Sequence, residues 1–236
     1  MKIEIAQNDD ELARQAAEWM LQEARKSRGV FAVSLAGGET PRRLYTLLAT
    51  APYSESFPFE RAHWFFGDER FVPPDDPMSN YRMARETLFA RVRVKRENLH
   101  PIPTENMTPE QSASRYEQEL RKFYGSDELD PERPLFAIEL LGLGKDGHTA
   151  SLFPGNPALR QRDSWVVAVD ATHGARITLT YPALDSASSV AFLVSGFNKR
   201  AALRRLIRGD QSIPAARVRP SGEVFLFADT HAMATD

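Results

Sequence analysis

The chain alternates between short continuous apolar runs and longer segments in which apolar residues recur at helical spacing. Apolar runs of about four to eight residues, bounded by glycine, proline or polar turns, are typical of buried strands. We predict such strands at residues 30–35, 62–66, 134–141, 190–195 and 223–228, and a half-buried alternating strand at 2–6. Strands separated by helical segments indicate an α/β fold with a mostly parallel sheet.

Weaker strand signals occur at residues 98–103, 165–169 and 175–180. Helices are predicted where a capping residue precedes a helical apolar pattern. The candidate N-caps are Asn8 or Asp9, Thr40, Ser79 and Thr108. Pro41 would be the first residue of the second helix, and Gln111 would complete a capping box with Thr108.

A loop rich in glycine and polar side chains follows the strongest strand signal. Residues 140–155 read LLGLGKDGHTASLFPG. Ligands of open α/β sheets bind just past the ends of such strands. We therefore expect a site here, in which Gly142 and Gly144 permit a tight backbone path while Asp146 and His148 face a substrate.

A dinucleotide-binding loop is the alternative interpretation of this stretch. Its glycines spell G-x-G-x-x-G, and Asp170 lies roughly where a ribose-binding acid would stand. That motif must open a helix of ordinary length, because the helix N-terminus holds the pyrophosphate. Pro154 and Pro157 follow Gly147 closely and leave room for only one or two helical turns. The pattern therefore disfavours a dinucleotide.

Two other segments complete a recognisable set of motifs. Residues 34–41 read SLAGGETP, and residues 67–73 read GDERFVP, followed by Ser79, Asn80 and Tyr81. Together with GLGKDGHTASLFPG, and in this order, they resemble the three motifs of the 6-phosphogluconolactonase family from about residue 30 onward. The resemblance implies one domain over residues 1–236, built as a modified Rossmann-like open sheet that is mostly parallel, with helices on both faces. It also implies hydrolysis of 6-phospho-D-glucono-1,5-lactone to 6-phosphogluconate, in the oxidative pentose phosphate pathway, without a cofactor.

Four predicted strand ends carry groups suited to a phosphate or a sugar: residues 37–40, 68–70, 146–148 and 196–199. The strand ends of a parallel sheet converge on one edge. A desolvated phosphate needs several N–H donors and a cationic side chain. Gly38, Thr40, Arg70 and Lys199 meet that need, and the resemblance implies the same assignment. The substrate-binding candidates are Gly37, Gly38, Thr40, Asp68, Arg70, Asn80, Gly144, Arg176 and Lys199.

Hydrolysis of a lactone requires an activated water molecule and stabilisation of an oxyanion. Histidine is the side chain best suited to accept a proton from water near neutral pH. The resemblance places the family's proposed general base on His148, and we expect Asp146, two residues away, to orient the imidazole or support it electrostatically. We expect backbone N–H groups of the glycine-rich turns to bind the oxyanion. An ester is already electrophilic, so no metal is expected, and no G-x-S-x-G elbow supports Ser151 as a nucleophile.

Two other functions fit parts of this pattern. A sugar-phosphate isomerase or deaminase resembling glucosamine-6-phosphate deaminase needs a further carboxylate for proton transfer. In that family's pattern a glutamate precedes the Pro-Gly of the motif, where this chain has Phe153. A sugar-phosphate binding module without catalysis is the second alternative, and the presence of both Asp146 and His148 disfavours it.

Three positions depart from the lactonase pattern. Glu39 stands where the family commonly has a small hydroxyl residue, and its charge disfavours a phosphate unless the side chain points away. Ala137 replaces an acid that is frequent in the strand before the central motif. Glu139 places a charged residue within a strand predicted to be buried.

The composition limits the partners and the cellular compartment that we expect. The net charge of −2 arises from interspersed charges of both signs, so we expect no nucleic-acid partner, and arginines such as Arg200 and Arg204 are expected on a solvated helix face. The absence of cysteine excludes disulfides, thiolate metal ligands and a cysteine nucleophile. No signal peptide or long apolar segment is evident, so we expect a cytoplasmic protein without membrane contact. The oligomeric state stays open, with a monomer slightly favoured.

Overall fold

The computed structural model describes residues 1–27 and 29–234. Its main sheet has six strands in the order β1-β9-β8-β5-β2-β3, and every neighbouring pair is parallel. These strands are β1 (Lys2–Ala6), β2 (Phe31–Leu35), β3 (Ala62–Phe66), β5 (Phe136–Leu141), β8 (Ala187–Val194) and β9 (Glu223–Asp229). The continuous apolar runs thus form the predicted parallel sheet.

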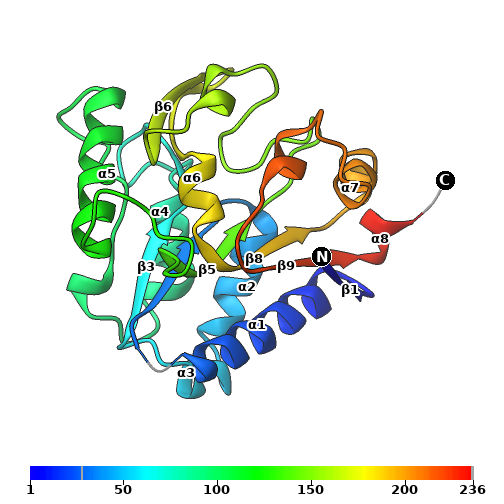
Figure 1. The fold of residues 1–236 in the computed structure, drawn as a ribbon. Coiled ribbons are helices and arrows are strands. Elements are labelled where there is room, and N and C mark those ends of the chain that lie inside the picture. The colour runs from blue at the N-terminus through cyan, green and yellow to red at the C-terminus, as the bar shows by residue number, and fades with distance from the viewer. Residues whose placement is uncertain (28, 235–236) are drawn as a thin grey trace.

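Helices cover both faces of this sheet, as predicted. In Figure 1, α1 and α2 lie on one side, whereas α5 and α6 lie on the other. The α-helices are α1 (Asp9–Lys26), α2 (Glu39–Leu48), α3 (Tyr53–Ser56), α4 (Asn80–Ala84), α5 (Pro109–Tyr124), α6 (Tyr181–Asp185), α7 (Arg200–Ile207) and α8 (Thr230–Met233). A π-helical turn (Arg85–Phe89) and 3₁₀ turns (Arg96–Asn98, Pro157–Arg160, Phe197–Lys199 and Pro214–Arg217) complete the set. No helix in the described ranges is both long and apolar enough to cross a membrane.

A second, three-stranded antiparallel sheet stands apart from the first, in the order β4-β7-β6. It contains β4 (Asp68–Arg70), β6 (Val166–Ala171) and β7 (Gly174–Leu179). Gly67 joins the two sheets, because its N–H donates to Leu35 O of β2 and its carbonyl accepts from Leu179 N of β7. Buried apolar residues of both sheets belong to one hydrophobic cluster. The described chain therefore shares one core.

The capping predictions hold for three helices and fail for one. The side chains of Asn8, Ser79 and Thr108 accept hydrogen bonds from the first turns of α1, α4 and α5, and the capping box at Thr108 is complete. Thr40 is not an N-cap: α2 begins at Glu39, and Gly38 caps it with φ +112° and no side-chain bond. A glycine adopts this φ without the steric cost that threonine would meet there.

The predicted strand at residues 98–103 is also wrong. The segment contains the end of a 3₁₀ turn (Arg96–Asn98) and one isolated bridge between Leu99 and Trp64. Beyond that bridge, Pro101 and Pro103 have no backbone N–H to donate to a neighbouring strand. The segment therefore runs beside β3 without extending the sheet.

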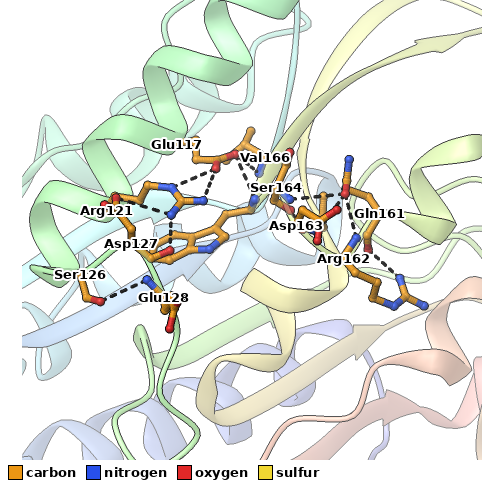
Figure 2. A network of polar contacts seen from close by, with 12 residues as sticks. Glu117, Arg121, Ser126, Asp127, Glu128, Gln161, Arg162, Asp163, Ser164 and Val166 are labelled. Carbon is orange, nitrogen blue, oxygen red and sulfur yellow. Dashed lines mark hydrogen bonds and ion pairs between the residues drawn. The ribbon is translucent and has the colours of Figure 1, made fainter.

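A polar network ties α5 to the start of β6, as Figure 2 shows. One carboxylate oxygen of Glu117 accepts from Arg121 Nε and Nη2 at 3.0 and 2.6 Å, and the other accepts from the backbone N–H groups of Trp165 and Val166 at 3.0 and 3.1 Å. The Arg121 guanidinium lies 4.6 Å from the centre of the Trp165 indole ring. Glu117 thus holds β6, and through β6 it holds β7.

We expect Glu117→Ala to destabilise the protein, because two backbone donors and one arginine lose their acceptor together. Hydrogen bonds to charged groups contribute about 2 kcal/mol, so Tm should fall by about 4–8 °C. The control is Gln118→Ala, an exposed neighbour on the same helix. Equal melting temperatures for the two variants, measured by calorimetry, would show that the network contributes no stability.

Candidate active site

A cavity of about 690 Å³ opens where the carboxyl ends of β2, β3, β5 and β8 meet. Every residue predicted for the site lines it: Gly37, Gly38, Thr40, Asp68, Arg70, Asn80, Gly144, Asp146, His148, Arg176 and Lys199. These residues are spread over more than half of the length of the chain. The parallel strands bring the turns that carry them to one edge of the sheet. Lys145 and Ser195 also line the cavity and were not predicted, whereas Asn198 belongs to the predicted strand end at residues 196–199.

Asp146 and His148 form a hydrogen-bonded pair at the cavity wall. His148 Nδ1 lies 2.6 Å from Asp146 Oδ1, and the His148 backbone N–H donates to the same oxygen at 3.1 Å. Burial alone would raise the pKa of Asp146, but the backbone hydrogen bond and the charge of His148 outweigh it and lower that pKa. A carboxylate can only accept, so Nδ1 is the donor and the Nε2 lone pair is left for another partner.

The glycine before this pair is required by close packing. A Cβ at Gly144 would lie 2.1 Å from His148 Nδ1 and 2.6 Å from Asp146 Oδ1. The Gly144 N–H donates to His148 O at 2.8 Å, and the Gly147 N–H donates to Gly144 O at 3.0 Å. These two N–H groups are already used within the loop, so the expected oxyanion donors would be other N–H groups of the glycine-rich turns. The loop holds the imidazole in place.

Asp68 and Asn80 form another part of the cavity wall, and both are buried. Asn80 Nδ2 donates to the Asp68 backbone carbonyl at 2.8 Å and to Asp68 Oδ1 at 3.3 Å, while Asn80 Oδ1 accepts from Arg70 Nη1. Arg70 also donates to Met78 O at 2.9 Å. A Cβ at Gly37 would lie 2.0 Å from Asn80 Oδ1, so the glycine of the GGET turn makes room for this amide.

The cavity carries cations that acidic side chains do not fully neutralise. Arg176 on β7 forms no ion pair within the described chain, and its buried Nε has no hydrogen-bond partner. Burial, followed by the charge of Arg70, lowers the pKa of Arg176. Among residues 1–27 and 29–234, Lys199 Nζ donates only to a neutral acceptor, Leu143 O, at 2.7 Å. Burial, followed by the charge of Lys145, lowers the pKa of Lys199. Cations held in this way favour an anionic ligand.

Glu39 also lines the cavity, but most of its side chain is exposed to solvent. Its side chain is 86% exposed and pairs with Arg42 at 3.3 Å. The start of α2 still presents Gly38 and Thr40 to the cavity, and the helix dipole adds partial positive charge there. The charge that sequence comparison flagged as unfavourable is therefore directed toward solvent.

Asp229 is a supporting residue that sequence reasoning missed. It is buried, accepts from Ser195 Oγ at 2.8 Å and Gly196 N at 3.1 Å, and caps α8 through Ala232 N at 2.7 Å. It thereby fixes the turn that leads to Lys199. An aspartate directly after an apolar run and before a short helical segment is the signal that points to it.

Glu139 lies directly behind the cavity, fully buried in β5. Its Oε1 accepts from Ser34 Oγ at 3.0 Å, and its Oε2 has no hydrogen-bond partner. A Cβ at Gly67 would lie 2.9 Å from Glu139 Oε1, so the glycine that joins the two sheets also makes room for this carboxyl. Burial raises the pKa of Glu139 well above its usual range, and the nearby charge of Asp68 adds to that effect.

Within residues 1–27 and 29–234, no group of three histidine or acidic side chains is arranged to hold a metal ion. An open parallel sheet with an Asp–His pair and unneutralised cations at its carboxyl edge defines an α/β enzyme for an anionic substrate. The chain belongs to the glucosamine-6-phosphate isomerase/6-phosphogluconolactonase family, whose model matches residues 7–227.

Several relatives of this chain are 6-phosphogluconolactonases. A 6-phosphogluconolactonase from a Nostoc species is 41% identical over 215 residues, covering 90% of this chain and 87% of the relative. One from a Synechocystis species is 40% identical with the same coverage. The crystal structure of 6-phosphogluconolactonase from Thermotoga maritima superposes with a TM-score of 0.83 at 30% identity, covering 97% of this chain and 99% of that one.

We expect Glu139→Gln to change how stability depends on pH. A carboxyl whose pKa is higher in the folded than in the unfolded state stabilises the fold at low pH, and that contribution is lost as pH rises. The loss begins near the unfolded pKa of about 4.3 and approaches about 1.4 kcal/mol per pH unit. Glutamine does not titrate, so the variant should gain stability relative to the parent protein between pH 5 and 8. Urea unfolding of both proteins at several pH values measures this, and parallel profiles would contradict it.

Proposed function

We propose that the protein hydrolyses 6-phospho-D-glucono-1,5-lactone to 6-phosphogluconate, without a metal, in the oxidative pentose phosphate pathway. The observation that carries this proposal is the Asp146–His148 pair, with an Nδ1 to Oδ1 distance of 2.6 Å, in a cavity that also contains Arg70, Arg176 and Lys199. The pair is suited to activating water, and the cations are suited to a phosphate. The lactonases among its relatives support the same reaction.

His148 is proposed as the general base. With Nδ1–H donated to Asp146, Nε2 takes a proton from water while the water oxygen bonds to the lactone carbonyl carbon. Asp146 stabilises the imidazolium that results. The bond from this carbon to the ring oxygen then breaks, and the imidazolium returns its proton to that oxygen. One water molecule is consumed, and His148 ends in its starting state.

We assign the phosphate to the cationic part of the cavity. Arg70 and Arg176 repel one another, and a dianion between or beside them removes that repulsion. Lys199 and the N-terminal turn of α2, at Gly38 and Thr40, add further donors. Gly37, Asp68, Asn80 and Gly144 are proposed to shape the cavity and bind the sugar.

The deaminase alternative conflicts with the surroundings of His148. The Phe153 ring lies 4.7 Å from the imidazole, centre to centre, and tilted by 55°. An apolar ring at this place transfers no protons, whereas ring opening and isomerisation require a further acid or base there. The lactonase reaction has no such requirement.

All the contacts that we propose come from one chain. We propose that the protein acts as a monomer and that it consists of one domain. We place the enzyme in the cytoplasm, acting on a free sugar phosphate without a nucleic-acid partner. The arginines of α7 fit this proposal, because Arg205 pairs with Asp210 at 2.8 Å, and Arg200 and Arg204 donate to the backbone near α8.

We expect His148→Ala to lower the rate of lactone hydrolysis by about 100-fold or more, the usual scale for a general base. The measurement is acid release from fresh 6-phosphoglucono-1,5-lactone, with spontaneous hydrolysis subtracted. His173→Ala, at an exposed histidine on the turn between β6 and β7, is the matched control. Full activity of His148→Ala would remove this residue from the role.

Three substrates separate the candidate functions. We expect rapid turnover of the phosphorylated lactone, with kcat/KM at least about 100-fold lower for the unphosphorylated lactone, because it lacks the charge that Arg70 and Arg176 bind. We expect no ammonia from glucosamine 6-phosphate. Ammonia release without lactone hydrolysis would favour the deaminase, and no turnover of any of the three would favour a binding module.

A further inference from the structure

Asp68 and the loop that carries His148 form two parts of the cavity wall, and one buried side chain connects them. Ser151 Oγ donates to Asp68 Oδ2 at 2.6 Å, although the two residues are 83 positions apart. Ser151 is fully buried, and Asp68 is nearly so. A hydrogen bond from a hydroxyl to a carboxylate is strong in such surroundings, where no water replaces it.

The backbone around Ser151 is arranged to make this contact. Ala150 has φ +47°, a left-handed conformation that costs free energy for a residue with a Cβ. The Ser151 N–H donates to Thr178 Oγ1 at 3.1 Å, and Thr178 pairs directly with Asp68 between β7 and β4. On the other side of the strained residue, Thr149 Oγ1 donates to Gly142 O at 2.9 Å. The loop is thus anchored at both ends of this turn.

Ser151 is not itself placed for nucleophilic attack. Its hydroxyl is buried and bonded to a carboxylate, and the histidine of the site is bonded to Asp146 instead. A serine nucleophile needs an exposed oxygen beside a general base. The short bond to Asp68 therefore has another purpose.

We propose that Ser151 is a positioning residue for the reaction: its hydroxyl couples the Asp68 carboxylate, on the sugar-binding wall, to the loop that carries His148. This inference rests on the proposed function. The two walls come from different sheets, because β4 belongs to the antiparallel sheet and the loop follows β5 of the parallel sheet. The Ser151–Asp68 bond fixes their separation, and with it the place of His148 relative to a bound sugar. A displacement of about 1 Å at such a place can reduce rates about 100-fold.

A double-mutant cycle tests this coupling. Ser151→Ala, Asp68→Asn and the double variant are compared with the parent protein in kcat and KM for 6-phosphoglucono-1,5-lactone. We expect Ser151→Ala to lower kcat about tenfold or more while KM changes less, because a hydrogen bond to a charged group is lost. In the Asp68→Asn background the same change should cost less than about twofold, since its partner is already altered.

Controls separate positioning from general stability. Ser112→Ala removes another fully buried hydroxyl, on α5, which donates to Pro103 O. This variant should leave kcat unchanged. Ser151→Cys keeps the side-chain volume with a weaker donor and should give intermediate kcat. It replaces Ser151→Ala in the cycle if the alanine variant fails to fold.

Each outcome has a defined meaning. Additive losses in the cycle, or unchanged kcat in Ser151→Ala, overturn the positioning role while leaving the proposed function intact. Absence of hydrolysis by the parent protein overturns the proposed function. In that case the same four proteins are compared in their Kd for 6-phosphogluconate, measured by calorimetry. Additive effects on that Kd, or no binding by the parent protein, overturn the coupling as well.

Discussion

The parallel direction of the six main strands is the constraint on which the site depends. It brings the turns after β2, β3, β5 and β8 to one edge, where each contributes groups that could not act alone. Helix α2 begins at this edge, so its positive end adds to the cations already there. The antiparallel sheet then closes the edge from one side and contributes Asp68, Arg70 and Arg176.

Three carboxyl groups near this edge, those of Asp68, Glu69 and Glu139, are buried. They differ in the number of hydrogen bonds that they accept. Glu69 accepts from the backbone N–H groups of Arg70, Asn80 and Tyr81 and from Ser79 Oγ, which oppose the rise in pKa that burial causes. Asp68 accepts from two side chains. Glu139 accepts from Ser34 Oγ alone among the described residues. Burial raises the pKa of both Glu69 and Glu139, and for Glu139 the rise is well above the usual range. The raised pKa of Glu139 favours its neutral form, which avoids placing two negative charges together in a dry interior.

The two walls of the cavity therefore have different kinds of support. The His148 loop has local backbone bonds, from Gly144 N to His148 O and from Gly147 N to Gly144 O, in addition to the distant contact of Ser151 with Asp68. The Asp68 wall is held by bonds from residues far away in the chain. One of them is Glu117 of α5, which binds the start of β6 in the same small sheet. Substitutions that weaken the second kind of support can disturb catalysis without touching a residue that contacts substrate.

The sequence by itself determined the parallel sheet and three of four helix caps, because strand periodicity and capping are local signals. The set of residues around the cavity came from the strand-end turns together with the resemblance to the lactonase motifs. The sequence misplaced the start of α2, since Gly38 rather than Thr40 supports the positive φ there. Only the tertiary structure decided that β4, β6 and β7 form a separate sheet, that Glu139 lies under Gly67, and that Ser151 binds Asp68. Those contacts join residues tens of positions apart, and their energies depend on burial, which no local pattern encodes.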